Sequence, residues 1–231
     1  MLLFYQPDIA AGTTWLSEEE SKHCTRVLRK REGEAITVTD GKGFFYECTI
    51  TKADARKCEF IIDKIIPETQ QAFRIHIAIA PTKNADRLEW LVEKVTELGV
   101  AEITLLDCDH SERTYTKLER LQKVAISAMK QSQKATLPLI HDLSPFKKIF
   151  TQESEQRFIA YVDFGNPQHL IQVATKHKHY LILIGPEGDF SKEELALALQ
   201  HGFMKISLGN SRLRTETAGM AACCLLNSIN S

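Results

Sequence analysis

The chain has 231 residues, and its 29 Lys and Arg side chains nearly balance its 30 Asp and Glu side chains, so the formal net charge is −1. A chain of this length buries roughly 70% of its unfolded surface on folding, which suits one large or two small domains. No apolar run approaches the ~20 residues that cross a bilayer, which excludes a membrane-spanning protein, and a basic surface for nucleic acid would have to be local.

The N-terminal part, residues 1–69, is predicted to be a small β-rich domain. Residues 1–8 have no basic start and no long apolar region, so we expect a strand there and not a signal peptide. Alternating segments at 35–40, 44–50 and 58–63 are separated by turn residues, notably Asp40-Gly41 and Gly43.

A basic segment, residues 22–31, holds five Lys or Arg side chains and no acidic one. The candidate RNA-binding residues in it are Lys22, His23, Arg26, Arg29, Lys30 and Arg31. Two interpretations remain open: a local footprint for RNA, or a solvated amphipathic helix with Val27 and Leu28 facing the core.

After a division near residues 67–71, strands and helices alternate to the C-terminus. Strands are predicted at 73–80, 102–106, 157–163, 180–184 and 204–208, and helices at 85–98, 117–134 and 192–201. This alternation is typical of an α/β domain with a mainly parallel sheet, here over residues 70–231.

Two loops in this second part, 185–191 and 207–214, each follow an apolar strand and open a helix, as ligand-binding loops of α/β sheets do. Gly185 and Gly188 allow close approach of the backbone to a ligand. Ser191 and Glu194 form a capping box for the helix that follows. The glycine spacing matches neither a P-loop nor a dinucleotide fingerprint, and Glu187 and Asp189 would repel a pyrophosphate, whereas a positively charged sulfonium ligand fits.

The six cysteines show no paired two-residue spacing, so neither a zinc site nor a disulfide framework is expected. They are typical of small buried side chains in a reducing compartment. We therefore expect a cytoplasmic protein without a metal ion.

Five stretches of the chain, in the same order as in the family, resemble one enzyme family. They are Gly185-Pro-Glu-Gly188 with Ser191 and Glu194, then Leu208-Gly209 with Leu213-Arg-Thr-Glu-Thr-Ala218, and the stretches 23–29, 93–100 and 131–138 agree with it as well. The family is the RsmE-type uridine-N3 methyltransferases of small-subunit (16S) rRNA, within the SPOUT class. The resemblance spans nearly the whole chain.

This resemblance implies a PUA-like β-barrel over residues 1–69 that binds RNA, and a SPOUT methyltransferase domain over 70–231 with a C-terminal trefoil knot. It also implies S-adenosylmethionine as cofactor, a homodimer, and the small ribosomal subunit with its 16S rRNA as partner. Periodicity does not predict the knot; only the resemblance does.

The resemblance assigns catalytic roles to Arg214, which would stabilise the uridine anion, and to Glu216, which would face the sulfonium or take the N3 proton. The expected cofactor-binding residues come from both loops: Ile184, Gly185, Pro186, Glu187, Gly188, Ser207, Leu208, Gly209, Leu213, Thr215, Thr217 and Ala218. For Glu187, Thr215 and Thr217 a purely structural role at a helix start is an equal alternative.

The chain departs from the family pattern in two places. Asp189 stands where a second glycine is usual, and Ser211 and Arg212 replace the usual Arg and Ile. These departures keep open a non-catalytic RNA-binding protein of the same fold. A SPOUT enzyme acting on another RNA, such as transfer RNA, is a second alternative, because only the resemblance indicates the ribosomal substrate.

Overall fold

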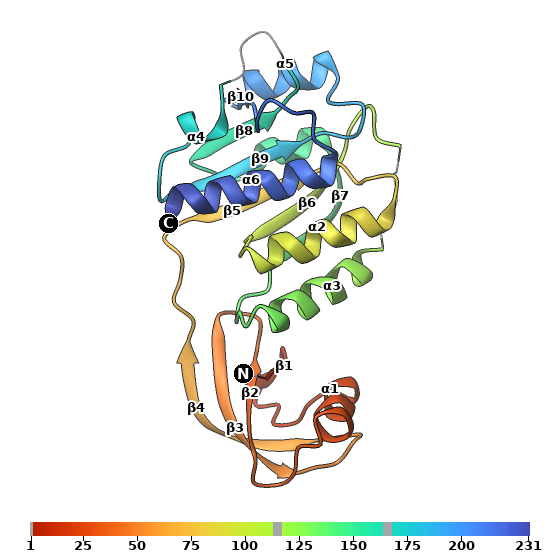
Figure 1. Cartoon of the computed structure of the whole chain (residues 1–231), viewed down its shortest axis with the longest axis vertical. Coiled ribbons are helices and arrows are strands. Elements are labelled where there is room, and N and C mark those ends of the chain that lie inside the picture. The colour runs from red at the N-terminus through yellow and green to blue at the C-terminus, as the bar shows by residue number, and fades with distance from the viewer. Residues whose placement is uncertain (1, 113–116, 164–167) are drawn as a thin grey trace. The chain divides into compact units, whose positions relative to one another are not determined.

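The computed structural model describes residues 2–112, 117–163 and 168–231, and Figure 1 shows the order of the elements. The chain divides into two compact units, Met1–Gln70 with Ile126–Leu137 and Gln71–Ala125 with Pro138–Ser231. The first unit therefore includes a segment from the middle of the chain that the sequence-based division does not contain.

The first unit is built on a four-stranded sheet in the order β1-β2-β3-β4. Its strands are β1 (Leu3–Tyr5), β2 (Ala35–Thr39), β3 (Phe44–Lys52) and β4 (Glu59–Pro67). β1 pairs with β2 in parallel, whereas β2, β3 and β4 are antiparallel. The turn between β2 and β3 is closed by Asp40, whose Oδ1 accepts a hydrogen bond from the Lys42 amide at 2.7 Å.

The 126–137 segment is joined to this sheet by backbone hydrogen bonds. The amide of Gly43 donates to the Ala135 carbonyl at 2.9 Å, and the amide of Leu137 donates to the Gly41 carbonyl at 2.8 Å. Long-range bonds do not change the local sequence pattern, so periodicity could not assign this segment to the first unit.

The basic segment differs from its prediction. Helix α1 (Glu18–Lys22) continues into a π-helical turn, His23–Val27, in which the Leu28 amide bonds to the His23 carbonyl five residues back at 3.0 Å. The wider turn directs Cys24 into the core and leaves Val27 68% exposed, so the prediction that Val27 faces the core was wrong.

The second unit contains a six-stranded, wholly parallel sheet in the order β10-β8-β9-β5-β6-β7. Its strands are β5 (Arg74–Ile79), β6 (Glu102–Asp107), β7 (Leu139–Pro145), β8 (Gln156–Ala160), β9 (His179–Ile184) and β10 (Met204–Ile206). Its helices are α2 (Ala85–Glu97), α4 (Leu170–Val173), α5 (Lys192–Gln200) and α6 (Thr215–Asn230). Helix α3 (Leu118–Gln131) begins in the second unit and ends in the 126–137 segment of the first. The predicted α/β class with a parallel sheet is confirmed.

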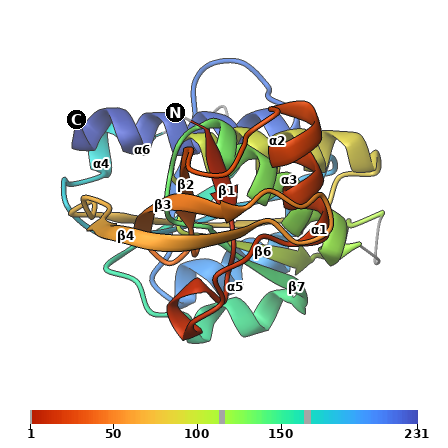
Figure 2. The same cartoon turned by 90° about the horizontal axis from the view of Figure 1, so that it is seen from below.

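Both faces of this sheet are covered, as its apolar central strands require. One face packs against α2 and α6, with Ile79 of β5 and Leu91 of α2 in contact distance of Gly219. The other face packs against Phe146, Phe203 and the α5 residue Ala198. In Figure 2, α2 and α6 lie together along one side and α5 lies on the other. The sheet therefore leaves only its strand ends for ligands.

Three elements of the second unit were not predicted: β7, α4 and the 3-10 helix Phe146–Thr151. β7 is an edge strand with no fully buried residue, and it ends on Pro145, so its apolar signal is weak. α4 has only four residues, too few for a helical period to be visible.

Candidate functional site

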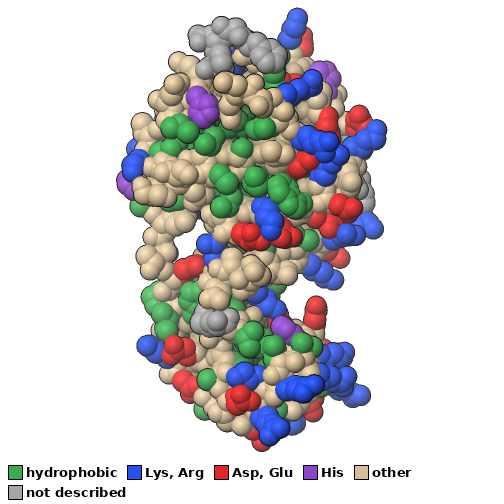
Figure 3. Space-filling view, in the orientation of Figure 1, with side chains coloured by type: hydrophobic (Ala, Val, Ile, Leu, Met, Phe, Trp, Pro, Cys, Tyr) green, Lys and Arg blue, Asp and Glu red, His purple; other side chains and the backbone are tan. Residues whose placement is uncertain are grey.

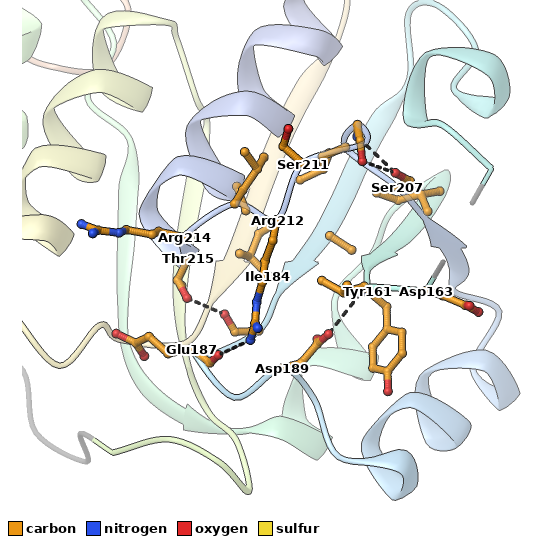
Figure 4. A pocket seen from close by; sticks show the side chains of 18 of the residues that line it. Tyr161, Asp163, Ile184, Glu187, Asp189, Ser207, Ser211, Arg212, Arg214 and Thr215 are labelled. Carbon is orange, nitrogen blue, oxygen red and sulfur yellow. Dashed lines mark hydrogen bonds between the residues drawn. The ribbon is translucent and has the colours of Figure 1, made fainter. Parts of the chain in front are cut away.

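A cavity of about 640 Å³ lies at the carboxyl ends of β8, β9 and β10 (Figure 4). Its walls are the segment that continues β8, the loop after β9, and the loop between β10 and α6. A site at this edge is expected, because ligands of parallel α/β sheets bind at the carboxyl ends of the strands.

Most of the predicted cofactor-binding residues line this cavity. They are Ile184, Gly185, Pro186, Glu187, Ser207, Leu208, Gly209, Leu213, Thr215 and Ala218, and Arg214 lines it as well. Gly188, Glu216 and Thr217 do not belong to its lining.

The loop after β9 is held close to its neighbours. A Cβ on Gly185 would lie 3.2 Å from the backbone nitrogen of Phe190, so a side chain there would crowd the turn. The Thr215 hydroxyl donates to the Gly185 carbonyl at 3.1 Å and thereby joins this loop to the start of α6. Ser191 and Glu194 form the predicted capping box in both directions.

The loop before α6 folds over the same cavity. Gly209 has φ +136°, a conformation that strongly favours glycine, and the Ser207 hydroxyl donates to the Gly209 carbonyl at 3.0 Å. The Arg212 guanidinium reaches across and donates to the Glu187 carbonyl at 3.5 Å. Arg212, which stands one residue after the arginine that is usual in the family, therefore joins the two loops.

Arg214 extends in a different direction. In Figure 4 its guanidinium points away from Ser207 and Tyr161, whereas Arg212 points toward Glu187. Arg214 is exposed, and within the described ranges its side chain has no hydrogen bond or ion pair. It is therefore a cation at the cavity rim that is available to a ligand.

Carboxylates balance these cations. Asp163, Glu187 and Asp189 all line the cavity, and Glu187 Oε1 accepts a hydrogen bond from the Lys83 amide at 3.2 Å. The pKa of Lys83 is raised by its hydrogen bond and charge interaction with Glu112, and Glu187 adds to this effect. A cavity with both signs of charge suits a zwitterionic ligand that also carries a positive centre.

Glu216 is buried beside α2. Its residue is 7% exposed, and Oε1 lies 3.7 Å from Arg87 Nε. Within the part of the chain that the structure describes, Oε2 is buried without a hydrogen-bond partner. The carboxylate at the second position of α6 thus points toward α2 and not into the cavity lining.

The wall that continues β8 was not predicted from the sequence. Ala160, Tyr161, Val162 and Asp163 line the cavity, as do Ile206 and Asn210. The 157–163 strand was predicted, and its carboxyl end would have indicated these residues had the strand order been known.

Comparisons with known proteins decide the family. Residues 69–227 match the RNA methyltransferase domain family, and residues 16–63 match the RNA methyltransferase PUA domain family. The chain belongs to the RNA methyltransferase family. Its first unit therefore contains the predicted PUA-like domain, and the predicted resemblance to small-subunit rRNA methyltransferases is confirmed.

Several relatives of this RNA methyltransferase cover almost its full length. "Ribosomal RNA small subunit methyltransferase E" of Bacillus subtilis (strain 168) is 26% identical, over 92% of this chain and 88% of its own. A solved structure from Porphyromonas gingivalis, named a probable rRNA-methyltransferase, is 42% identical with a TM-score of 0.94, covering 100% of this chain and 98% of the other.

A further relative was solved with a ligand. Ribosomal RNA small subunit methyltransferase E from Neisseria gonorrhoeae, bound to S-adenosyl methionine, is 26% identical to this RNA methyltransferase with a TM-score of 0.87, over 100% of this chain and 98% of the other. The knot implied by the resemblance stays a prediction. None of the described helices is both long and apolar enough to span a membrane.

Proposed function

We propose that this RNA methyltransferase transfers a methyl group from S-adenosylmethionine to N3 of a uridine in the 16S rRNA of the small ribosomal subunit. One observation carries the proposal: two of the stretches that show the resemblance, the loops after β9 and β10, form walls of the same cavity. The S-adenosyl methionine bound to the Neisseria gonorrhoeae relative supports the cofactor. A cytoplasmic location follows from the ribosomal substrate.

The cavity fits this cofactor in size and chemistry. Its volume, about 640 Å³, lies within the range of small-molecule sites. Backbone groups of Gly185, Leu208 and Gly209 would hold the adenine and ribose, and Arg212 would meet the carboxylate of the methionine part. When bound, the cofactor supplies an electrophilic methyl carbon.

The chain's own residues would bind and activate the uridine. N3 of uridine is an imide nitrogen that must give its proton to a base, here solvent water, before it attacks. Arg214, an exposed cation at the rim, would stabilise the negative charge that develops on O2 or O4. Glu216 would not contact the uridine. Its ion pair with Arg87 would hold the start of α6 against α2.

The basic segment of the first unit would bind the RNA. Lys22 and Lys30 are paired with Glu18 and Glu34 at 2.6 and 3.0 Å. By contrast, Arg26 and Arg29 are exposed, and their guanidinium groups have no ion pair within the described residues. Figure 3 shows Lys and Arg side chains gathered over the α1 region. These two arginines, with Arg31 and His23, are the proposed contacts to phosphate.

Helix α6 would form a homodimer interface. After Glu216 it carries no charged residue, and Met220, Ala221, Cys224 and Leu225 are only half-buried in the single chain. Figure 3 shows hydrophobic side chains on the face where α6 lies. Sedimentation equilibrium should give twice the mass of one chain, and Met220→Arg should shift it toward the monomer; a monomeric native protein would contradict the dimer.

Donor binding and RNA choice test the function together. The purified chain should bind S-adenosylmethionine in a calorimetric titration. With methyl-labelled donor it should then label unmodified small ribosomal subunits or their rRNA, and not transfer RNA. Label in transfer RNA would favour another RNA substrate, and absence of donor binding would favour a non-catalytic RNA-binding protein.

A further inference from the structure

Asp189 is a non-glycine residue held in the left-handed backbone region. Its φ is +64°, and its amide donates to the Pro186 carbonyl at 2.9 Å, which closes the turn after β9. Aspartate tolerates this region better than most residues but pays a cost relative to glycine. An aspartate in this backbone conformation is therefore expected to make contacts that offset the cost.

The Asp189 side chain and carbonyl together join three loops. Oδ2 accepts a hydrogen bond from the Val162 amide at 3.1 Å, and Oδ1 accepts one from the Phe190 amide at 2.9 Å. The Asp189 carbonyl accepts from His110 Nδ1 at 2.9 Å. The three loops follow β8, β9 and β6, and Val162 and Asp189 both line the cavity.

The hydrogen bond from the Val162 amide to Asp189 lies just beyond the point where the pairing of β8 ends. β8 stops at Ala160, and the last backbone bond on this path runs from the Tyr161 amide to the Ile206 carbonyl at 3.2 Å. Two residues further, Asp163 pairs with Lys205. Between Tyr161 and Asp163, the Asp189 carboxylate binds the Val162 amide. This hydrogen bond orients the segment that forms the wall of the cavity.

We infer that Asp189 is a positioning residue of the methyl-donor pocket. Its carboxylate fixes the 161–163 segment so that the wall is formed before the donor binds, which removes an ordering cost from binding. A hydrogen bond from an amide to a charged acceptor is strong enough for this purpose. The inference rests on the proposed function, because the ligand it names is the proposed donor.

Two substitutions separate the side chain from the backbone conformation. Asp189→Gly keeps the left-handed turn without strain and removes the carboxylate. Asp189→Asn keeps the turn and one acceptor oxygen and removes the charge. Asp54→Gly is the matched control, because Asp54 Oδ1 also accepts two backbone bonds, from Arg56 and Lys57 at 2.7 and 3.3 Å, but in an exposed turn outside the cavity.

The measurements are the dissociation constant for S-adenosylmethionine, the kcat and KM of methyl transfer, and hydrogen exchange of the Val162 amide in the absence of ligand. Asp189→Gly should weaken donor binding about tenfold, raise KM more than it lowers kcat, and speed exchange at Val162. Asp189→Asn should stay within about threefold of the native affinity, since one acceptor suffices for the Val162 amide. Asp54→Gly should match the native protein.

Native affinity and native Val162 exchange in Asp189→Gly would overturn the inference. A loss in Asp189→Asn as large as in Asp189→Gly would also overturn it, because the charge itself would then contact the ligand. If the native chain binds no donor, the proposed function fails. In that case faster Val162 exchange in Asp189→Gly would still establish the junction of loops, and unchanged exchange would refute it.

Discussion

Arg212 and Arg214 lie two residues apart in one loop, but they occupy different surroundings. Arg212 is bonded to the Glu187 carbonyl across the cavity, and Arg214 extends to the rim without a partner among the described residues. If Arg214 stabilises the uridine anion, it acts mainly in the transition state, whereas Arg212 acts on the bound donor.

Arg214→Ala should therefore lower kcat about 10²-fold while the dissociation constant of the donor changes little. Arg212→Ala should do the reverse, weakening donor binding more than turnover. Steady-state kinetics and calorimetry separate the two effects. Arg120→Ala, which removes an exposed arginine paired with Glu89 on another helix, is the control. Equal losses of kcat in both loop variants would refute the division of roles.

His76 predicts how stability changes with pH. Burial lowers the pKa of this imidazole to about 4, with Glu102 opposing and His141 and Arg74 reinforcing the shift, and Nε2 lies 2.8 Å from Thr104 Oγ1. In the unfolded chain the ring takes a proton below about pH 6.5. The free energy of unfolding should therefore fall by about 3 kcal/mol as the pH drops from 6.5 to 4.

His76→Gln should flatten this dependence in urea titrations between pH 6.5 and 4. His177→Gln, an exposed histidine of the turn before β9, should leave it as in the native protein. A native slope in His76→Gln would show that carboxylates alone account for the loss of stability in acid.

Helix α6 depends on a close approach to α2 and β5. A Cβ at Gly219 would lie 3.0 Å from Leu91 Cδ1 and 3.2 Å from Ile79 Cδ1. The helix can therefore pack this closely because residue 219 has no side chain. Gly219→Val should lower the free energy of unfolding by about 1–3 kcal/mol, because the helix must move outward. Ser228→Val adds the same side chain at an exposed site of α6 and should cost less; equal costs in denaturant titrations would refute the packing argument.

The elements differ in how far their sequences predict them. β9 is a continuous apolar run followed by a capping box, and both signals are local, so the strand, the loop and the start of α5 were predicted within a residue or two. Val27 was placed wrongly because a π-helical turn changes the helical period without a recognisable residue pattern. The β8 wall of the cavity was missed because strand order is decided by long-range pairing.

The molecule as a whole is almost neutral, so RNA affinity has to come from a few local cations. The charge pattern of the sequence indicated the basic segment, and the structure leaves Arg26 and Arg29 of that segment exposed and without an ion pair within the described ranges. RNA binding through so few phosphate contacts should weaken only moderately with salt. The cofactor would thus be bound by the C-terminal loops, and the RNA by the basic segment of the N-terminal unit.

The central claim is the atom that receives the methyl group. Unmodified small ribosomal subunits should be incubated with the full chain and methyl-labelled S-adenosylmethionine, and the 16S rRNA digested to nucleosides and separated against methylated standards. The account predicts that the label co-elutes with N3-methyluridine. Label in C5-methyluridine, in a 2′-O-methylated nucleoside or in any base other than uracil would contradict it.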